Sequence, residues 1–220
     1  LLGENGAGKS TLMKILAGFQ PPTSGRLLLD GQDVAFVSPS DALARGVGML
    51  YQEPHDFPAF RAVENHLLAY DEKLVLALRE GASVLQSEGD RLGFHTDPQT
   101  YLDTLSLGER QQIEMLRLLA LGADFLILDE PTTGISAEQK EVLFRTMRRL
   151  AHEEGKTIVL VSHKLEEVQE LCDEVAVLRA GKLVGTQKLP CSTDDLVRLM
   201  FGQSMARGER SALQREATVL

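Results

Sequence analysis

Apolar residues along the chain form short continuous runs that alternate with longer segments of helical spacing. Short apolar runs bounded by turn residues are typical of buried strands. We predict strands at 26–29, 47–51, 125–128, 157–161 and 175–178. A further strand at 182–186 is expected to pair back on the last of these through the Ala180-Gly181 turn, and Asp30-Gly31 marks another hairpin turn.

Helices are predicted where apolar positions recur every three or four residues. These segments are 9–17, 63–79, 107–121, 137–152, 164–172 and 194–201. Strands that alternate with helices indicate an α/β fold with a mostly parallel sheet. Residues 53–118 contain no strand pattern, so we interpret them as an inserted helical lobe.

These patterns predict one domain over residues 1–220. Its core lobe would comprise residues 1–52 and 119–190, and its helical lobe residues 53–118. Residues 191–220 would supply a last helix and a polar tail that resembles a linker.

Composition narrows the class of protein. The formal net charge of −9 argues against nucleic-acid binding, because such proteins usually carry a basic surface. No stretch of 18 apolar residues is present, so no membrane-spanning helix is predicted. Cys172 and Cys191 are isolated, which favours free thiols in a reducing compartment over a metal or redox site.

A phosphate-binding motif lies near the start of the chain. Residues 3–10 read GENGAGKS and fit G-x-x-x-x-G-K-[ST]. Such a loop wraps its backbone N–H groups around phosphates, its Lys reaches the β- and γ-phosphates, and its Ser hydroxyl ligates Mg²⁺. Chance produces the motif in roughly 1% of chains of this length. The candidate nucleotide-binding residues are Gly3, Glu4, Asn5, Gly6, Ala7, Gly8, Lys9, Ser10 and Thr11.

Two carboxylates end the apolar run FLILDE at 125–130. Ligands gather at the carboxyl ends of parallel strands, so Asp129 would help to hold Mg²⁺ and Glu130 would polarise an attacking water. Taken alone, these residues fit an ordinary acidic turn better. The phosphate loop in the same chain makes the functional interpretation the stronger one.

The stretch LSLGERQ at 105–111 has the pattern of a helix start. Ser106 and Glu109 form a capping box, which is a complete structural explanation in itself. Gly108, however, disfavours the helix and permits another group to approach closely. A capped helix end with exposed N–H groups also suits an anion.

The order of these motifs resembles the nucleotide-binding subunit of ABC transporters. A phosphate loop is followed by MLYQEP, LSLGERQ, FLILDEP and a strand that ends in VSH, and the resemblance extends to about residue 201. It implies a P-loop NTPase core with an inserted helical subdomain, and two such domains that sandwich two ATP molecules.

The resemblance also implies roles for individual residues. Residues 3–11 would be the Walker A loop, and Asp129 and Glu130 the Walker B pair. Ser106 and Gly108 would belong to the signature motif, which contacts ATP on the partner domain. Gln52 would contact Mg²⁺ and connect to the helical lobe, and His163 would be the switch histidine.

Two departures from the family pattern are present. The signature motif, which usually reads L-S-G-G-Q in the family, reads LSLGE at residues 105–109 here. Ser136 stands in place of the Asp that crosses the dimer interface in the family. Ser136 and Gln139 form a second capping box. LSLGERQQIEMLRLL, SHKLEEV and LVRLMFGQ resemble the first half of double-domain ATPases from sugar and nucleoside importers.

We therefore expect an ATPase on the cytoplasmic face of the membrane that uses ATP and Mg²⁺ to energise an importer. Its partners would be a second ATPase domain, in the same polypeptide or as a dimer, transmembrane permease subunits and an extracytoplasmic binding protein, without nucleic acid. The alternatives are an ABC-type ATPase that acts on ribosomes or DNA, and a regulatory module that binds ATP. The resemblance also implies that a preceding strand and an adenine-stacking residue are missing, since only Leu1-Leu2 precede the loop.

Overall fold

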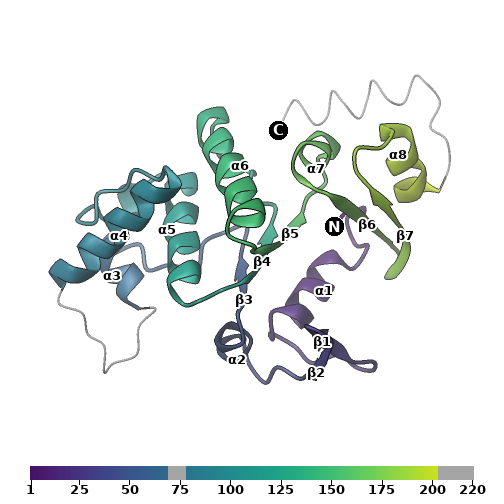
Figure 1. Ribbon diagram of the computed structural model, residues 1–220, viewed down its shortest axis with the longest axis horizontal. Helices are drawn as coiled ribbons and strands as arrows, with labels where there is room; N and C mark the ends of the chain where they lie inside the picture. Colours follow the sequence, from purple (N-terminus) through teal and green to yellow (C-terminus); the bar gives the residue numbers. More distant parts are fainter. Residues whose placement is uncertain (69–77, 203–220) are drawn as a thin grey trace. The chain divides into compact units, whose positions relative to one another are not determined.

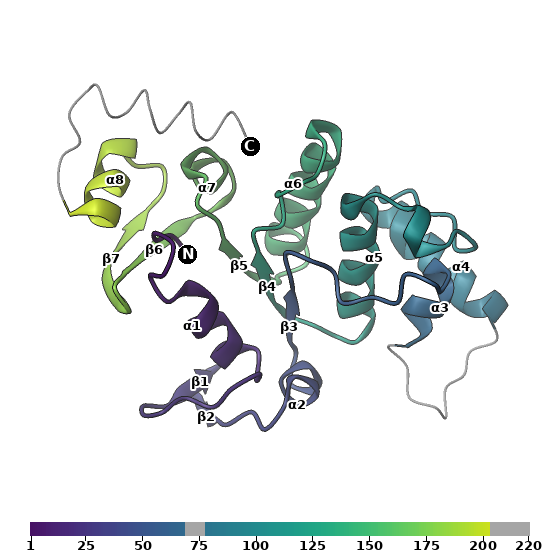
Figure 2. The ribbon, with the colours of Figure 1, turned by 180° about the vertical axis from the view of Figure 1, so that it is seen from behind.

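The computed structural model describes residues 1–68 and 78–202, which divide into two compact units (Figures 1 and 2). Among the described residues, one unit comprises residues 1–9 and 162–202, and the other comprises residues 10–68 and 78–161. Within the described ranges, no helix is both long enough and apolar enough to cross a membrane.

A three-stranded parallel sheet organises the larger unit. Its strands lie in the order β3 (Val47–Leu50), β4 (Phe125–Asp129) and β5 (Thr157–Val161). Leu126, Ile127 and Leu128 of the central strand are fully buried, as expected for a parallel strand covered on both faces. The α/β fold class and these three strand positions are confirmed.

Helices of the larger unit pack against this sheet. Helix α1 (Lys9–Leu16) follows the phosphate loop, and α6 (Ala137–His152) packs against β5. Helix α5 (Leu107–Ala120) packs against β3, as does the short α2 (Pro39–Ala44), which the apolar pattern did not predict. Ser38 caps α2 by accepting a hydrogen bond from the Asp41 backbone N–H, and Pro39 occupies its first turn.

The lobe expected to be helical contains α3 (Ala62–Leu67), α4 (Leu78–Leu92), a 3₁₀ turn (Leu102–Thr104) and α5. Helices α3, α4 and α5 pack against one another, and an isolated bridge joins Arg61 to Tyr101. Of the helix predicted at 63–79, the first part is confirmed as α3, while residues 69–77 lie outside the described part of the chain. Helix α4 was not predicted.

Both expected hairpins form. β1 (Leu27–Leu29) and β2 (Gln32–Val34) are joined by Asp30-Gly31, with φ angles of 50° and 76°. β6 (Glu174–Arg179) and β7 (Lys182–Lys188) are joined by Ala180-Gly181, with φ angles of 48° and 75°. Two successive positive φ angles are the type I′ geometry that matches the twist of paired strands.

The smaller unit encloses its own apolar core. Leu2 bridges to Val177 of β6 in parallel orientation, donating its N–H to the Ala176 carbonyl over 2.9 Å. Helices α7 (Leu165–Leu171) and α8 (Thr193–Phe201) also contribute side chains. The buried members of this core are Leu2, Val168, Val175, Val177, Leu196 and Met200. The core fixes the strand segment from which the phosphate loop departs.

Candidate functional site

The phosphate loop is anchored to the β6–β7 hairpin within the smaller unit. The Gly181 N–H donates to the Ala7 carbonyl over 3.0 Å, and the Ala7 N–H donates to the Glu4 carbonyl over 3.0 Å. A Cβ atom on Gly3 would lie 2.4 Å from the Leu178 carbonyl oxygen, so only glycine fits there. Gly6, with a φ of 80°, has no atom within 4 Å of its absent Cβ and leaves open space in the loop.

Lys9 points its amine back across this loop. Its Nζ donates to the Gly3 carbonyl over 2.6 Å and to the Glu4 carbonyl over 3.1 Å. An ammonium group has three protons, so a third can be directed at a phosphate oxygen. Lys9 also begins α1, whose first N–H groups favour an anion. The neighbouring hydroxyl-bearing residues, Ser10 and Thr11, are exposed. The loop therefore has the donor arrangement that a nucleotide phosphate requires.

The acidic strand end is held in an unusual backbone conformation. Asp129 pairs with Val161 as the last residue of β4. Glu130 adopts a φ of 47°, which side-chain-bearing residues rarely do, and its N–H donates to the Val161 carbonyl over 2.9 Å. The Thr133 hydroxyl lies 3.5 Å from Glu130 Oε2. These contacts fix the carboxylate just beyond the carboxyl edge of the sheet, where ligands bind in such folds.

Gln52 follows the neighbouring strand at the same edge. Leu50 of β3 pairs with Leu128 of β4, so Gln52 and Asp129 leave adjacent parallel strands. The pKa of Tyr51 is raised by burial and then by the negative charges of Glu114 and Asp129. The oxygens of Ser10, Gln52 and Asp129, all in the larger unit, are the hard donors that Mg²⁺ prefers.

Ser106 caps α5 as its sequence predicted. The Ser106 N–H donates to Glu109 Oε2 over 2.8 Å, and the Glu109 N–H donates to Ser106 Oγ over 3.4 Å. Ser106 is exposed, whereas Gly108 is buried. The capping box is confirmed, and its hydroxyl lies at the molecular surface.

His163 is exposed and lies in the smaller unit, two residues after the end of β5. The preceding residue, Ser162, is buried, and its Oγ accepts a hydrogen bond from the Lys164 N–H over 3.0 Å. The turn that carries His163 is therefore well defined.

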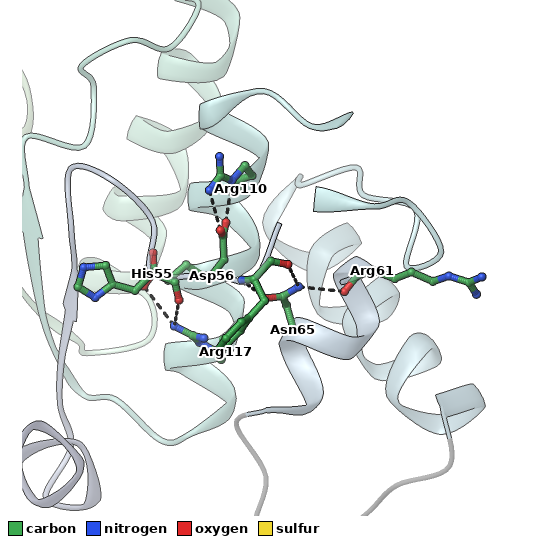
Figure 3. A network of polar contacts seen from close by, with 8 residues as sticks. His55, Asp56, Arg61, Asn65, Arg110 and Arg117 are labelled. Atoms are coloured by element: carbon green, nitrogen blue, oxygen red, sulfur yellow. Dashed lines mark hydrogen bonds and ion pairs between the residues drawn. The ribbon is translucent and has the colours of Figure 1, made fainter. Parts of the chain in front are cut away.

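Side chains of helix α5 form hydrogen bonds with residues of the segment 52–57 (Figure 3). The sequence alone did not indicate this contact. Arg110 binds Asp56 through two hydrogen bonds of 2.7 and 2.6 Å. The next residue, Gln111, donates to the Gln52 carbonyl over 3.2 Å, and Arg117, two turns after Arg110, donates to the His55 carbonyl over 3.4 Å. The helix that starts at Ser106 thus holds the backbone that follows Gln52.

Asn65 of α3 fixes the other side of this segment. Its Oδ1 accepts from the Phe57 N–H over 2.8 Å, and its Nδ2 donates to the Phe57 carbonyl over 3.1 Å and the Arg61 carbonyl over 3.2 Å (Figure 3). The Phe57 ring, 56% exposed, stacks on Phe60, 41% exposed, with ring centroids 5.4 Å apart. Asn65 therefore fixes the backbone of Phe57, and the exposed rings of Phe57 and Phe60 stack on each other.

Glu114 is an ionisable group buried in this arrangement. It is 4% exposed, and its Oε1 accepts from Arg117 over 3.2 Å. Burial raises its pKa to about 7, against the opposing effects of Arg117 and a backbone hydrogen bond from His55. Its Oε2 has no hydrogen-bond partner within the described ranges.

Sequence reasoning missed Asp56, Asn65, Arg110 and Glu114. A charged residue between Ile113 and Met115, on a helix otherwise buried there, is the one local sign that Glu114 has a buried role. Asp56 and Arg110 are 54 positions apart, and no local pattern joins them.

Two curated relatives extend across almost the whole chain. The ribose import ATP-binding protein RbsA 1 of Rubrobacter xylanophilus is 41% identical over 207 residues, which are 93% of this chain and 41% of that protein. The ribose import ATP-binding protein RbsA of Rhodopirellula baltica is 40% identical over 209 residues, which are 93% of this chain and 41% of that protein. The chain therefore spans about two fifths of the length of these relatives.

Solved structures share the fold. CbiO1 from Clostridium perfringens, described as part of the ABC transporter complex cbiONQ, aligns with a TM-score of 0.73 and 24% identity, over 91% of this chain and 82% of that one. The ATP-binding cassette MJ0796 bound to ADP and Pi aligns with a TM-score of 0.72 and 21% identity. The alignment covers 87% of this chain and 84% of that one. The ABC transporter family model matches residues 1–133, more than half of the chain. This chain belongs to the ABC transporter family.

Proposed function

We propose that this chain is an ATP-binding and ATP-hydrolysing domain that powers the import of a sugar, with ribose as the first candidate. The main support for this proposal is the position of Lys9 at the start of α1. Its amine lies across the glycine loop and donates to the carbonyls of Gly3 and Glu4. The import ATP-binding proteins that are 40% and 41% identical over nearly the whole chain support the transport role.

ATP would bind with its β- and γ-phosphates inside loop 3–10, where Lys9 and backbone N–H groups neutralise their charge. Ser10, Gln52 and Asp129 would hold Mg²⁺, which supplies charge neutralisation on the phosphates when bound. Glu130 would accept a proton from the water that attacks the γ-phosphorus, and ADP would leave with the electrons of the broken P–O bond. His163 would contact the γ-phosphate, as the resemblance to the family implies.

A second ABC domain would complete the site. Ser106, with the N–H groups at the start of α5, would face the γ-phosphate of ATP bound to that domain. ATP binding would therefore favour the closed pair, and hydrolysis would open it.

Helix α5 offers a route from this event to the membrane. It carries Ser106 at its start and holds segment 52–57 along one face. The exposed rings of Phe57 and Phe60 would contact a transmembrane permease, so the chain would act at the cytoplasmic face of the membrane as a peripheral subunit. An external binding protein would deliver the sugar to the permease.

The two other interpretations have less support. Action on ribosomes or DNA fits poorly with a net charge of −9. A module that binds ATP without hydrolysis has no need of a carboxylate held as Glu130 is.

An ATPase assay on the intact protein, alone and with its permease, tests the proposal. We expect magnesium-dependent turnover that the permease stimulates. Glu130→Gln should retain ATP and trap the closed pair of domains. Turnover retained in that variant would overturn the role of Glu130, and the absence of any stimulation would contradict the importer.

A further inference from the structure

The hydroxyl of Ser106 is fully engaged within its own chain. It donates to Glu109 Oε2 over 2.6 Å and accepts from the Glu109 N–H over 3.4 Å. The Gln139 side chain, 33 positions away, donates from Nε2 to the same oxygen over 2.8 Å. A hydroxyl has one proton and two lone pairs, so these three bonds use its whole capacity.

Gln139 reaches Ser106 from the first turn of α6. Its Oε1 accepts from the Ser136 N–H over 3.1 Å, and its backbone N–H donates to Ser136 Oγ over 3.2 Å. One carboxamide therefore caps α6 with its oxygen and binds the start of α5 with its nitrogen.

Gly108 is what permits this approach. A Cβ atom at position 108 would lie 2.6 Å from Gln139 Oε1 and 2.7 Å from its Cδ. The sequence indicated that Gly108 admits a close neighbour, and in this structure that neighbour is the chain's own Gln139. The Gln139 amide therefore lies against the first turn of α5, next to Ser106.

We propose that Gln139 is a latch on the signature motif, which must release Ser106 before that serine can bind the γ-phosphate of ATP on a second domain. The latch rests on the proposed function, because it presupposes that Ser106 binds ATP in trans. Release takes the Gln139 amide away from Oγ, and the Ser106 proton turns from the Glu109 carboxylate to a phosphate oxygen, which accepts it. Gln139 acts through Ser106 and is a positioning residue.

The latch should raise the ATP concentration that is needed to close the two domains. Breaking one net hydrogen bond changes an equilibrium constant by about 2- to 10-fold. Removing the Gln139 side chain should therefore lower the ATP concentration needed for closure by about 2- to 10-fold.

Hydrogen exchange at residues 105–109 of the intact protein, titrated with ATP, tests the latch. Gln139→Ala should shift half-protection to lower ATP, and the shift should vanish in a Ser106→Ala background, where the bond is already lost. Ser136→Ala is the matched control, because it weakens the α6 cap and leaves the bond from Nε2 in place. Equal shifts from Gln139→Ala and Ser136→Ala, or a shift that persists without Ser106, would overturn the latch.

The same titration separates the latch from the proposed function. If wild-type protein gains no protection at residues 105–109 with ATP, the proposed contact of Ser106 with ATP on a second domain is wrong. If wild type is protected and Gln139→Ala has no effect, that contact stands and the latch fails.

Discussion

The guanidinium of Arg110 holds the carboxylate of Asp56 through two hydrogen bonds, 2.7 Å from Nε and 2.6 Å from Nη2. The Asp56 side chain is 7% exposed and that of Arg110 is 25% exposed, so solvent screens the pair only in part. One partner follows Gln52, and the other lies one turn from Ser106. The pair therefore joins the two segments through which the proposed site would communicate with a permease.

Asp56→Asn should weaken this connection without altering its shape. Charge-assisted hydrogen bonds contribute about 1.5–3 kcal/mol each, so we expect the free energy of unfolding to fall by about 1–3 kcal/mol in denaturant titrations. Stimulation of ATP turnover by the permease should fall more than unstimulated turnover. Asp33→Asn is the matched control, because Asp33 and Arg26 are 3.8 Å apart on an exposed surface. Equal effects of both variants on stimulation would contradict the coupling role of Asp56.

Glu114 should make the stability of the larger unit depend on pH. Burial raises its pKa from the ordinary value of 4.5 to about 7, so the folded state binds a proton that the unfolded state releases between these values. The contribution of Glu114 to the free energy of unfolding is therefore fully present below pH 4.5, and it is lost as the pH rises to about 7. A rise in pKa of this size corresponds to roughly 3 kcal/mol.

Urea unfolding at a series of pH values measures this contribution. Glu114→Gln should flatten the fall in stability between pH 4.5 and pH 7. Glu138→Gln, on an exposed position of α6, serves as the control and should leave the pH profile of the wild type intact. A pH profile that Glu114→Gln leaves unchanged would show that another group titrates in this range.

Asn65→Ala should loosen segment 55–57. Asn65 is 2% exposed and satisfies both backbone groups of Phe57, which would be left without these bonds. These bonds are only partly buried and Phe57 is 56% exposed, so each contributes about 0.5–1.5 kcal/mol and a loss of stability of about 1–3 kcal/mol is expected. Hydrogen exchange at residues 55–60 should accelerate more than exchange in β4. Uniform acceleration across both would indicate general destabilisation instead.

Much of the fold was predictable because its determinants are local. The strands β3, β4 and β5 follow from continuous apolar runs, and the hairpin turns follow from Asp30-Gly31 and Ala180-Gly181. Helix α2 was missed because six residues give too short an apolar pattern, although Ser38 and Pro39 are recognisable start signals. Helix α4 was missed because Gly81 and Gly89 interrupt its helical preference.

The candidate site was predictable only as far as its motifs are contiguous. The phosphate loop, the carboxylates after β4 and the Ser106 cap each occupy a short stretch of sequence. The contacts of Ser106 with Gln139 and of Asp56 with Arg110 join residues 33 and 54 positions apart, and packing alone creates them. Ser136 and Gln139 were recognised as a capping box, but their second role at Ser106 has no local signature.

Uptake of labelled ribose into vesicles that contain the intact protein and its permease, with magnesium and ATP on the side of the ATPase, tests the central claim most directly. Wild-type protein should import the sugar only when ATP is supplied, and Lys9→Ala should abolish both uptake and ATP turnover. Uptake that continues at the wild-type rate with Lys9→Ala would contradict the claim that this loop powers import.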